Sequence, residues 1–257
     1  MTRCYYLIRR EEKPIKKILY VVITMASLII FSFCNFKLSL YFLKTLEKKD
    51  EDNRLKKQII KIDKETIEEK EDIDFDKLKK VNDEIVGWIN IPNTDIDYPI
   101  TIHDDNEYYL THSFDKDTSK HGSIFLHTYC KENINNLKNI FIFGHNMKDG
   151  TMFNELKNYV KQDWYDKHKN INLIFEDKQF ILEVFSAYST NDTNSYQYIF
   201  DDENDYKDYL DEIISKSKIQ VEVLPPNTNE KIFTLYTCSY ETKDARYFIH
   251  AKIKEVK

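Results

Sequence analysis

The 257-residue chain has few cysteines and no excess of basic residues. Cys4 and Cys34 lie before and within an apolar N-terminal segment, so only Cys130 and Cys238 belong to the rest of the chain. Two thiols make no disulfide framework, and no cysteine–histidine spacing resembles a zinc site. The 38 basic and 44 acidic residues are mixed along the sequence and give a net charge of −6, which disfavours nucleic-acid binding.

The sequence also lacks a recognisable metal-binding motif. Asp104, Asp105, Asp115 and Asp117 are scattered and do not form a calcium-binding loop. Cys130 follows a predicted strand within a polar loop, and we interpret it as a thiol without a catalytic role. We therefore expect no metal and no cofactor.

The chain has one long apolar run. Residues 19–36 carry no charge, and this run is close to the ~20 residues needed to span a membrane. A cleaved signal peptide is the alternative, but the run exceeds the usual apolar core of ~7–15 residues, and no small-x-small cleavage site follows it. We expect an uncleaved transmembrane anchor at residues 19–43, a cytoplasmic segment at residues 1–18 and the folded domain on the outer face of the cell membrane. This orientation follows from the basic residues before the run: Arg3, Arg9, Arg10, Lys13, Lys16 and Lys17.

Two further segments follow the anchor. Residues 44–73 are mostly charged, with isolated leucine and isoleucine residues at roughly helical spacing, which predicts a solvated helical stalk. Residues 74–257 are enough for one catalytic domain with a sizeable core. Its first apolar residues, from Phe75 to Val86, recur at helical spacing and predict a helix before the first strand.

After Trp88 the pattern changes to short strands separated by turn residues, which predicts a mainly β domain built as a mostly antiparallel barrel or sandwich. An amphipathic helix is predicted at residues 203–218, where tyrosine, leucine and isoleucine recur at helical spacing. In the last strand one face is apolar, and Arg246 points to the other. The predicted strands are 88–91, 96–100, 123–127, 140–143, 172–176, 179–188, 219–223, 231–238 and 246–254.

The last two strands carry the main chemical signal. Residues 234–238 read Thr-Leu-Tyr-Thr-Cys, a strand that ends on a thiol, and Arg246 begins the next strand after the polar turn 239–245. The Cys238 thiol and the Arg246 guanidinium are therefore predicted to face each other across a hairpin. A free thiol with a pKa of about 8.5 is mostly protonated near neutral pH, so a reactive thiolate needs a neighbouring cation or base. We expect a histidine nearby.

His145 is the best candidate for that base. It follows the apolar strand 140–143 and Gly144, and so lies where the chain leaves the sheet. Each of the three residues also has an ordinary structural interpretation. His145 could be a hydrogen-bonded structural histidine, Cys238 a small buried apolar residue and Arg246 a solvated hairpin arginine.

These motifs resemble those of the sortases, specifically class B, the membrane-anchored cysteine transpeptidases of Gram-positive bacteria. The resemblance rests on the Thr-Leu-x-Thr-Cys strand, the arginine eight residues later and Gly-His-Asn-Met-Lys-Asp-Gly-x-Met-Phe at 144–153. It covers roughly residue 74 to the C-terminus, and it includes the order histidine, cysteine, arginine. Further fragments that agree are 86–89, 91–92, 98–100, 106–110 and 121–126.

The resemblance implies an eight-stranded sortase barrel with N-terminal helices and an inserted helix before the penultimate strand. It also implies that the Cys238 thiolate attacks a threonine carbonyl in a C-terminal sorting signal and that His145 protonates the departing amine. Arg246 would bind the oxyanion or hold the substrate carbonyl. The implied partners are surface proteins with a sorting signal, the amine of a cell-wall precursor or of peptidoglycan, and the cytoplasmic membrane.

Further residues are implied to bind the sorting signal. Class B enzymes usually take an Asn-Pro-x-Thr type of signal, and we expect that preference rather than Leu-Pro-x-Thr. Tyr236 and Ser239 depart from the family pattern, because a small or polar residue and an acidic residue can stand there, and these departures bear on peptide selectivity. The implied signal-binding residues are Asn106, Leu110, Tyr198, Ile199 and Thr237.

Two other classes of protein remain open. Another cysteine acyltransferase would also use cysteine and histidine, but papain-type enzymes place the cysteine first and on a helix. An L,D-transpeptidase would have a glycine-rich segment around its nucleophile, and the chain has only four glycines. A membrane-tethered binding module with an inert barrel is the non-enzymatic alternative, and its buried thiol would be alkylated no faster than an ordinary free thiol.

Overall fold

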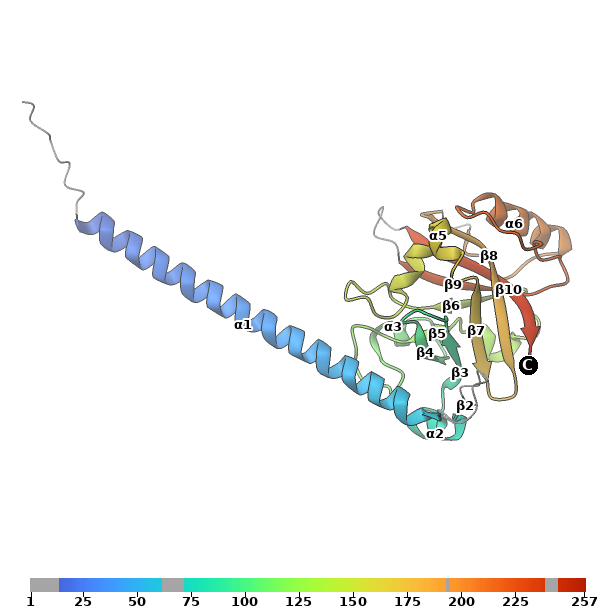
Figure 1. The fold of residues 1–257 in the computed structure, drawn as a ribbon, viewed down its shortest axis with the longest axis horizontal. Coiled ribbons are helices and arrows are strands. Elements are labelled where there is room, and N and C mark those ends of the chain that lie inside the picture. The colour runs from blue at the N-terminus through green and yellow to red at the C-terminus, as the bar shows by residue number, and fades with distance from the viewer. Residues whose placement is uncertain (1–13, 62–71, 193–194, 239–244) are drawn as a thin grey trace, which may run out of the picture. The chain divides into compact units, whose positions relative to one another are not determined.

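The structure is a computed structural model that describes residues 14–61, 72–192, 195–238 and 245–257. The chain divides into two compact units, residues 1–72 and residues 73–257. The first unit is helical and the second is rich in strands (Figure 1).

The first unit contains α1 (Pro14–Ile59), a helix of 46 residues. Its segment Ile18–Lys44 has a mean hydropathy of 2.2 and is long and apolar enough to cross a membrane. The short strand β1 (Ile60–Lys61) follows, and β2 (Asp72–Ile73) lies at the boundary of the two units. The predicted stalk at 44–73 begins within α1, but its residues 62–71, like residues 1–13, lie outside the described part of the chain.

The second unit is a closed eight-stranded barrel with the strand order β10-β8-β7-β3-β4-β5-β6-β9, which confirms the predicted fold class. Most neighbouring strands are antiparallel, whereas β4–β5 and β6–β9 are parallel. The strands are β3 (Ile85–Asn90), β4 (Asp97–Thr101), β5 (Ile124–Leu126), β6 (Asn139–Phe143), β7 (Asn170–Phe175), β8 (Gln179–Thr190), β9 (Ile232–Cys238) and β10 (Arg246–Val256).

The barrel interior is filled by one face of each strand. In β6, for example, Ile140 and Ile142 belong to the interior cluster, whereas Phe141 between them belongs to a second cluster. This alternation is the period of two that side chains follow along a strand. Both faces of β6 are therefore covered by apolar groups.

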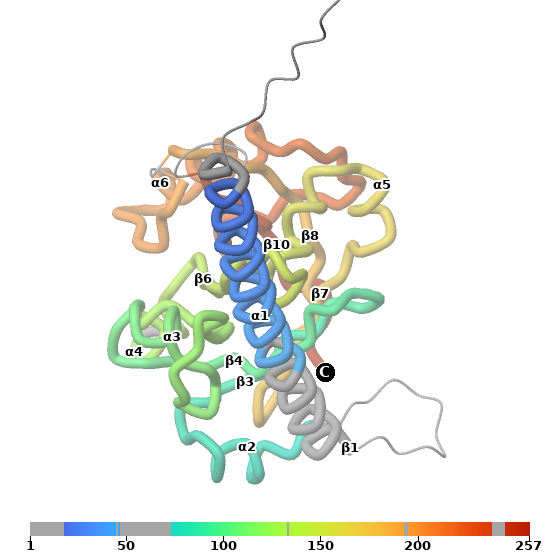
Figure 2. Tube along the Cα trace, turned by 90° about the vertical axis from the view of Figure 1, so that its left-hand side faces the viewer, coloured from blue at the N-terminus to red at the C-terminus, as the bar shows by residue number. Residues whose placement is uncertain are grey.

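The helices after α1 lie in the connections between strands. Figures 1 and 2 show α6 at one end of the barrel and α2 at the opposite end. The helix predicted from Phe75 to Val86 forms only as far as Val81, as α2, whereas Ile85 and Val86 belong to β3. The Asp74 carboxylate accepts a hydrogen bond from the Lys77 N–H and so caps the N-terminus of α2. The helices are α2 (Phe75–Val81), α3 (Tyr108–Thr111), α4 (Cys130–Asn133), the 3₁₀ helix η1 (Asn154–Val160), α5 (Gln162–Tyr165) and α6 (Glu203–Ser215).

The inserted helix α6 lies between the sixth and seventh barrel strands, β8 and β9, as the resemblance implied. Its N-cap Asp202 accepts hydrogen bonds from the first backbone N–H groups of the helix. The buried stripe of α6 packs against the second cluster of apolar residues on the barrel. α6 thus covers the face of β10 that points away from the barrel interior, and Phe248 and His250 are buried on this face.

One predicted strand is wrong. Residues 219–223 form no strand, and α6 ends at Ser215 rather than at the predicted Lys218. Ile219 is buried, so the alternating pattern correctly marked a half-buried segment. Burial alone does not make a strand, because the backbone N–H and C=O groups of a strand also need a neighbouring strand as hydrogen-bond partner.

Candidate active site

Three adjacent strand ends bring the predicted catalytic residues together. In the antiparallel pair of β9 and β10, Cys238 lies directly opposite Arg246. In the parallel pair of β6 and β9, Phe143 is paired with Tyr236. Continuing that register by two residues puts His145 beside Cys238. Because neighbouring strands lie about 4.8 Å apart, the three backbones are side by side at one end of the barrel.

Hydrogen bonds extend the β6–β9 contact past the last ladder pair. The Gly144 N–H donates to the Tyr236 carbonyl at 3.3 Å, and the buried Thr237 hydroxyl donates to the Gly144 carbonyl at 2.6 Å. A Cβ on Gly144 would lie 2.7 Å from the ring of Phe153, so this position has no room for a side chain. These contacts fix the exit of the chain from β6, and with it the backbone of His145.

The His145 ring is held by a backbone carbonyl of α3. His145 Nε2 lies 2.7 Å from the Leu110 carbonyl oxygen. A carbonyl only accepts hydrogen bonds, so Nε2 carries a proton in this contact, and Nδ1 is the nitrogen left to exchange a proton. Leu110 is therefore part of the site through its backbone.

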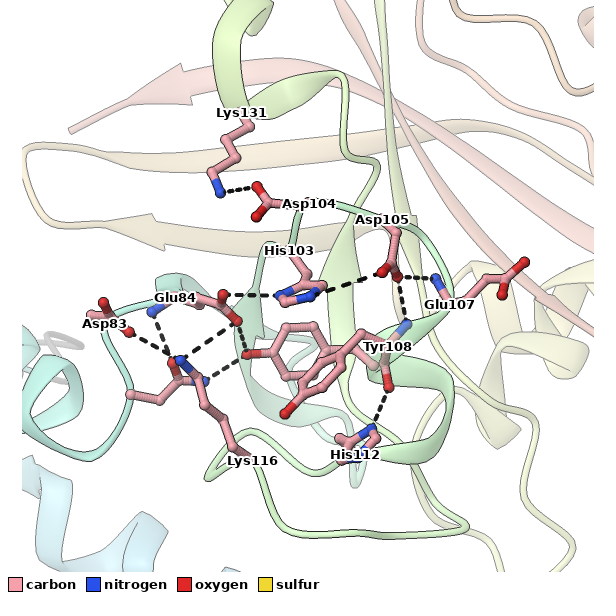
Figure 3. A network of polar contacts seen from close by, with 12 residues as sticks. Asp83, Glu84, His103, Asp104, Asp105, Glu107, Tyr108, His112, Lys116 and Lys131 are labelled. Carbon is pink, nitrogen blue, oxygen red and sulfur yellow. Dashed lines mark hydrogen bonds and ion pairs between the residues drawn. The ribbon is translucent and has the colours of Figure 1, made fainter.

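A polar network anchors the start of α3 (Figure 3). The buried Tyr109 hydroxyl donates to Glu84 Oε2 at 2.6 Å and accepts from Asn82 Nδ2 at 2.7 Å. Glu84 Oε1 also contacts His103 Nδ1 at 2.9 Å. The Tyr108 ring stacks between His103 and His112, at centroid distances of 4.3 Å and 4.0 Å. This network fixes the segment whose carbonyl holds His145.

Arg246 is half-buried at the start of β10. One of its Nη atoms donates to the Ala245 carbonyl at 2.9 Å. A guanidinium has several further N–H groups in a planar fork, so this contact orients the fork and leaves donors for a ligand.

The residues implied to bind the signal fall into an accessible group and a buried one. Leu110 is 37% exposed and Ile199 is 54% exposed. Asn106 Oδ1 accepts the Thr128 N–H at 2.8 Å, and the half-buried Tyr198 packs against a histidine, His127. Thr237, by contrast, is buried, and its hydroxyl serves Gly144.

His127 was not singled out by the sequence analysis. Its ring centroid lies 4.4 Å from that of Tyr198, and its Nε2 lies 3.0 Å from Asn106 Nδ2. The only signal in the sequence was its position at the end of the predicted strand 123–127.

Cys130 is the other cysteine of the domain, and its environment makes it unreactive. It begins α4 and is buried in the interior cluster rather than in the polar loop that was expected. Burial raises the pKa of its thiol to about 12, so it stays protonated and unreactive near neutral pH.

Comparison with known proteins identifies the family. Residues 89–254 match the Sortase domain family. Sortase B of Staphylococcus aureus is 36% identical over 186 residues, which are 71% of this chain and 75% of that protein. Sortase B of Listeria monocytogenes is 36% identical over 167 residues, which are 64% of this chain and 66% of that protein.

Solved structures agree with these matches. Clostridium perfringens sortase B aligns with a TM-score of 0.67 and 34% identity, covering 71% of this chain and 100% of that chain. A sortase B–substrate complex from Staphylococcus aureus aligns with a TM-score of 0.65 and 35% identity, covering 70% of this chain and 84% of that chain.

The family match spans more than half of the chain, so the chain belongs to the sortase family of cysteine transpeptidases. The relatives and solved structures named above are all sortase B proteins. It is a class B sortase, an enzyme that anchors surface proteins to the cell wall. The binding-module, papain-type and L,D-transpeptidase alternatives are thereby excluded.

Proposed function

We propose that this enzyme cleaves an Asn-Pro-x-Thr type of sorting signal after its threonine and joins the new carboxyl end to a cell-wall peptide amine. The observation that supports this most is the register of β6, β9 and β10, which brings the backbones of His145, Cys238 and Arg246 to adjacent strand ends. The proposed steps use only these side chains and the two substrates.

The first step is attack by the Cys238 thiolate on the threonine carbonyl carbon, which forms a tetrahedral intermediate. The amide C–N bond then breaks, and the departing amine takes a proton from the His145 imidazolium. A thioester between Cys238 and the threonine remains. Because the Leu110 carbonyl holds Nε2, the proton that is transferred is the one on Nδ1.

The second step is the reverse exchange with a different amine. The cell-wall amine attacks the thioester carbonyl and gives a proton to Nδ1 of His145. The C–S bond then breaks and regenerates the thiolate, so the thioacyl enzyme divides one amide exchange into two easier reactions. Arg246 stabilises the oxyanion in both tetrahedral intermediates with the donors that its contact to Ala245 leaves available.

Signal recognition is assigned to Asn106, Leu110, Tyr198 and Ile199. All four are at least partly accessible, and a contact through His127 joins the Asn106 segment to the Tyr198 segment. Thr237 contributes by fixing Gly144 rather than by touching the peptide with its side chain.

The domain organisation is proposed as residues 1–18 in the cytoplasm, an anchor at 19–43, a stalk at 44–73 and the catalytic domain at 74–257. The long apolar segment Ile18–Lys44 of α1 supports the anchor, and the basic residues before it support a cytoplasmic N-terminus. The catalytic domain then faces the cell wall, where its acceptor amine is found.

Intact mass spectrometry of the full chain in detergent tests the proposal. The chain is mixed with an Asn-Pro-x-Thr peptide or a Leu-Pro-x-Thr peptide, with Cys238→Ala in parallel. We expect a thioacyl adduct on the native chain with the Asn peptide, absent in the variant and released by an added amine. An adduct with the Leu peptide alone would contradict the proposed Asn-Pro-x-Thr preference. No adduct with either peptide on a folded protein would contradict the proposed mechanism.

A further inference from the structure

We propose that His127 is a positioning residue that organises the recognition of the signal's asparagine, by holding Asn106 and Tyr198 in one cluster. This inference rests on the proposed function. The roles of Asn106 and Tyr198 come from the family resemblance, whereas the part played by His127 comes from its contacts in this chain.

His127 lies directly after β5 and is only 5% exposed. Its backbone N–H donates to the Phe141 carbonyl at 3.1 Å, so the residue is tied to the middle of β6. The ring packs against Tyr198 at 4.4 Å and against Tyr129 at 5.4 Å, and these two tyrosine rings lie 5.1 Å apart. His127 is thus the shared neighbour of two aromatic side chains from separate connections.

The polar edge of the ring faces a third connection. Asn106 belongs to the segment between β4 and α3, and its Nδ2 lies 3.0 Å from His127 Nε2. Asn106 Oδ1 accepts the Thr128 N–H at 2.8 Å, which fixes the orientation of the amide. The Thr128 N–H therefore orients the Asn106 amide so that its NH₂ group faces the His127 ring.

The cluster has more hydrogen-bond donors than the ring can serve. The Tyr129 N–H points at His127 Nδ1 at 3.1 Å, while the Asn106 NH₂ group points at Nε2. Burial lowers the pKa of His127 to about 4, so the ring is neutral near neutral pH. A neutral imidazole accepts at only one nitrogen. One of the two facing N–H groups consequently lacks an acceptor on the ring.

A carbonyl oxygen from the substrate can supply the missing acceptor. Within an Asn-Pro-x-Thr signal, asparagine is the fixed residue whose side chain carries an amide oxygen. A leucine in its place brings no acceptor and leaves the surplus donor unpaired. Sites built to hydrogen-bond a substrate group discriminate strongly against analogues that lack it, because a buried polar group is then left unsatisfied. His127 thereby sets a preference for asparagine over leucine.

Two substitutions separate the contributions of the ring. His127→Phe keeps an aromatic ring against Tyr198 but removes both nitrogens, and His127→Asn keeps polar atoms but removes the aromatic ring. His168→Phe is the matched control, since His168 is also buried, stacks on Trp164 at 4.1 Å and contacts the Trp164 carbonyl at 2.8 Å. That histidine lies in the α5–β7 connection and contacts none of Asn106, Tyr129 and Tyr198 in the interactions described for it.

The measurement is kcat/KM of the full chain in detergent with Asn-Pro-x-Thr and Leu-Pro-x-Thr peptides, together with the melting temperature. We expect His127→Phe to lower the asparagine-to-leucine ratio of kcat/KM at least tenfold, mainly through KM for the asparagine peptide, because the Asn106 and Tyr129 N–H groups lose the ring nitrogens that orient them. His127→Asn should recover part of the ratio, and His168→Phe should leave it unchanged. In an Asn106→Ala background the effect of His127→Phe should largely disappear, because the two residues act through one contact.

An unchanged ratio in a folded His127→Phe protein would overturn the inference while leaving the proposed function in place. An equal fall in kcat/KM with both peptides would also overturn the inference, because it would mean that His127 only stabilises the fold. If the native chain turned over neither peptide, the proposed function would fail, and the role of His127 would fail with it.

Discussion

Two glycines show how much a single position contributes to the site. Gly122 and Gly150 both have positive φ, 61° and 90°. A Cβ on Gly122 would overlap the Tyr109 carbonyl oxygen and lie 3.1 Å from His145 Cδ2, whereas a Cβ on Gly150 would have no atom within 4 Å. Gly122 therefore allows the chain before β5 to pass closely beneath α3 and the His145 ring.

We predict that Gly122→Ala impairs catalysis and that Gly150→Ala does not. Both changes impose a backbone strain of about 1–3 kcal/mol. Only Gly122→Ala also displaces the group that holds His145, and a misplacement of ~1 Å can reduce a rate by ~10²-fold. Peptide turnover and thermal unfolding of the two variants test this prediction, and equal turnover in both would contradict it.

The second prediction for a single residue concerns the role of Arg246 in catalysis. Arg246→Lys keeps the positive charge but loses the planar fork of donors, so we expect kcat to fall by about 10²–10³-fold, as for other lost oxyanion donors. Lys254→Ala, near the other end of β10, serves as the control and should keep native turnover. Full activity of Arg246→Lys would remove Arg246 from the mechanism.

The sequence was informative about single residues where a motif is continuous. The positions of Cys238 and Arg246 follow from one hairpin, and the structure pairs them directly. His127 could not be predicted in the same way, because Asn106 and Tyr198 come from distant segments. Only the packed structure shows that these three side chains share hydrogen bonds and ring contacts.

At the scale of elements, α3 has four residues and depends on side-chain contacts for its position. We predict that Tyr109→Phe loosens α3, because it removes the hydroxyl that joins Glu84 and Asn82. A lost buried hydrogen bond costs about 1–3 kcal/mol. Tyr159→Phe is the control, since Tyr159 is equally buried and its hydroxyl donates to the His168 carbonyl at 2.9 Å.

Both tyrosine variants should melt at lower temperature, but only Tyr109→Phe should also lower kcat, because only α3 holds His145. A comparison of melting temperature and kcat for the two variants distinguishes this role from general stabilisation. An unchanged kcat in Tyr109→Phe would mean that Leu110 keeps its position without the network.

A buried histidine beneath α6 should make the stability of the fold depend on pH. His250 is buried between β8 and β9, with Nδ1 2.9 Å from Thr234 Oγ1 and Nε2 3.2 Å from the Tyr188 hydroxyl. Burial lowers the pKa of His250 to about 3. The unfolded chain has a histidine pKa of about 6.5, so it binds more protons than the folded chain between the two values.

Stability should therefore fall as the pH falls below about 6.5, by at most about 1.4 kcal/mol per pH unit for this group. Denaturant unfolding between pH 6.5 and 5, which is above the main range of carboxylate titration, measures the slope. His250→Gln should lower overall stability but give a smaller slope. If its slope equals that of the native chain, His250 is not the group that titrates.

The elements also show where sequence patterns stop being informative. Apolar alternation located the eight barrel strands, but it also predicted the strand 219–223, which has no ladder. Alternation reports burial of one face, whereas a strand is defined by its hydrogen-bonded neighbours. For the same reason, the parallel pairing of β6 with β9, which positions His145, could not be read from the pattern of either strand.

At the scale of the whole molecule, the two compact units have separate roles in the proposed function. Residues 73–257 contain the complete barrel and all three predicted catalytic residues. The first unit contains the apolar segment Ile18–Lys44. A helix of this length, at ~1.5 Å per residue, exceeds the ~30 Å hydrocarbon core of a bilayer.

We predict that removal of residues 1–72 gives a soluble enzyme with native kcat/KM toward peptides, while the full chain remains with the membrane fraction. The units share no predicted catalytic residue, so the chemistry should not need the helix. Sedimentation and peptide turnover of the two forms test this, and loss of turnover in the shorter chain would mean that the first unit supports the fold of the barrel.

The orientation of the full chain is the last prediction at this scale. Protease added outside intact cells should digest the barrel and leave an N-terminal tag protected, since basic residues before the helix favour the cytoplasmic side. Digestion of both ends after the cells are lysed is the control for access. Intact mass must also include the N-terminal residues, because a mature protein that lacks them would show that the apolar helix is a cleaved signal peptide rather than an anchor.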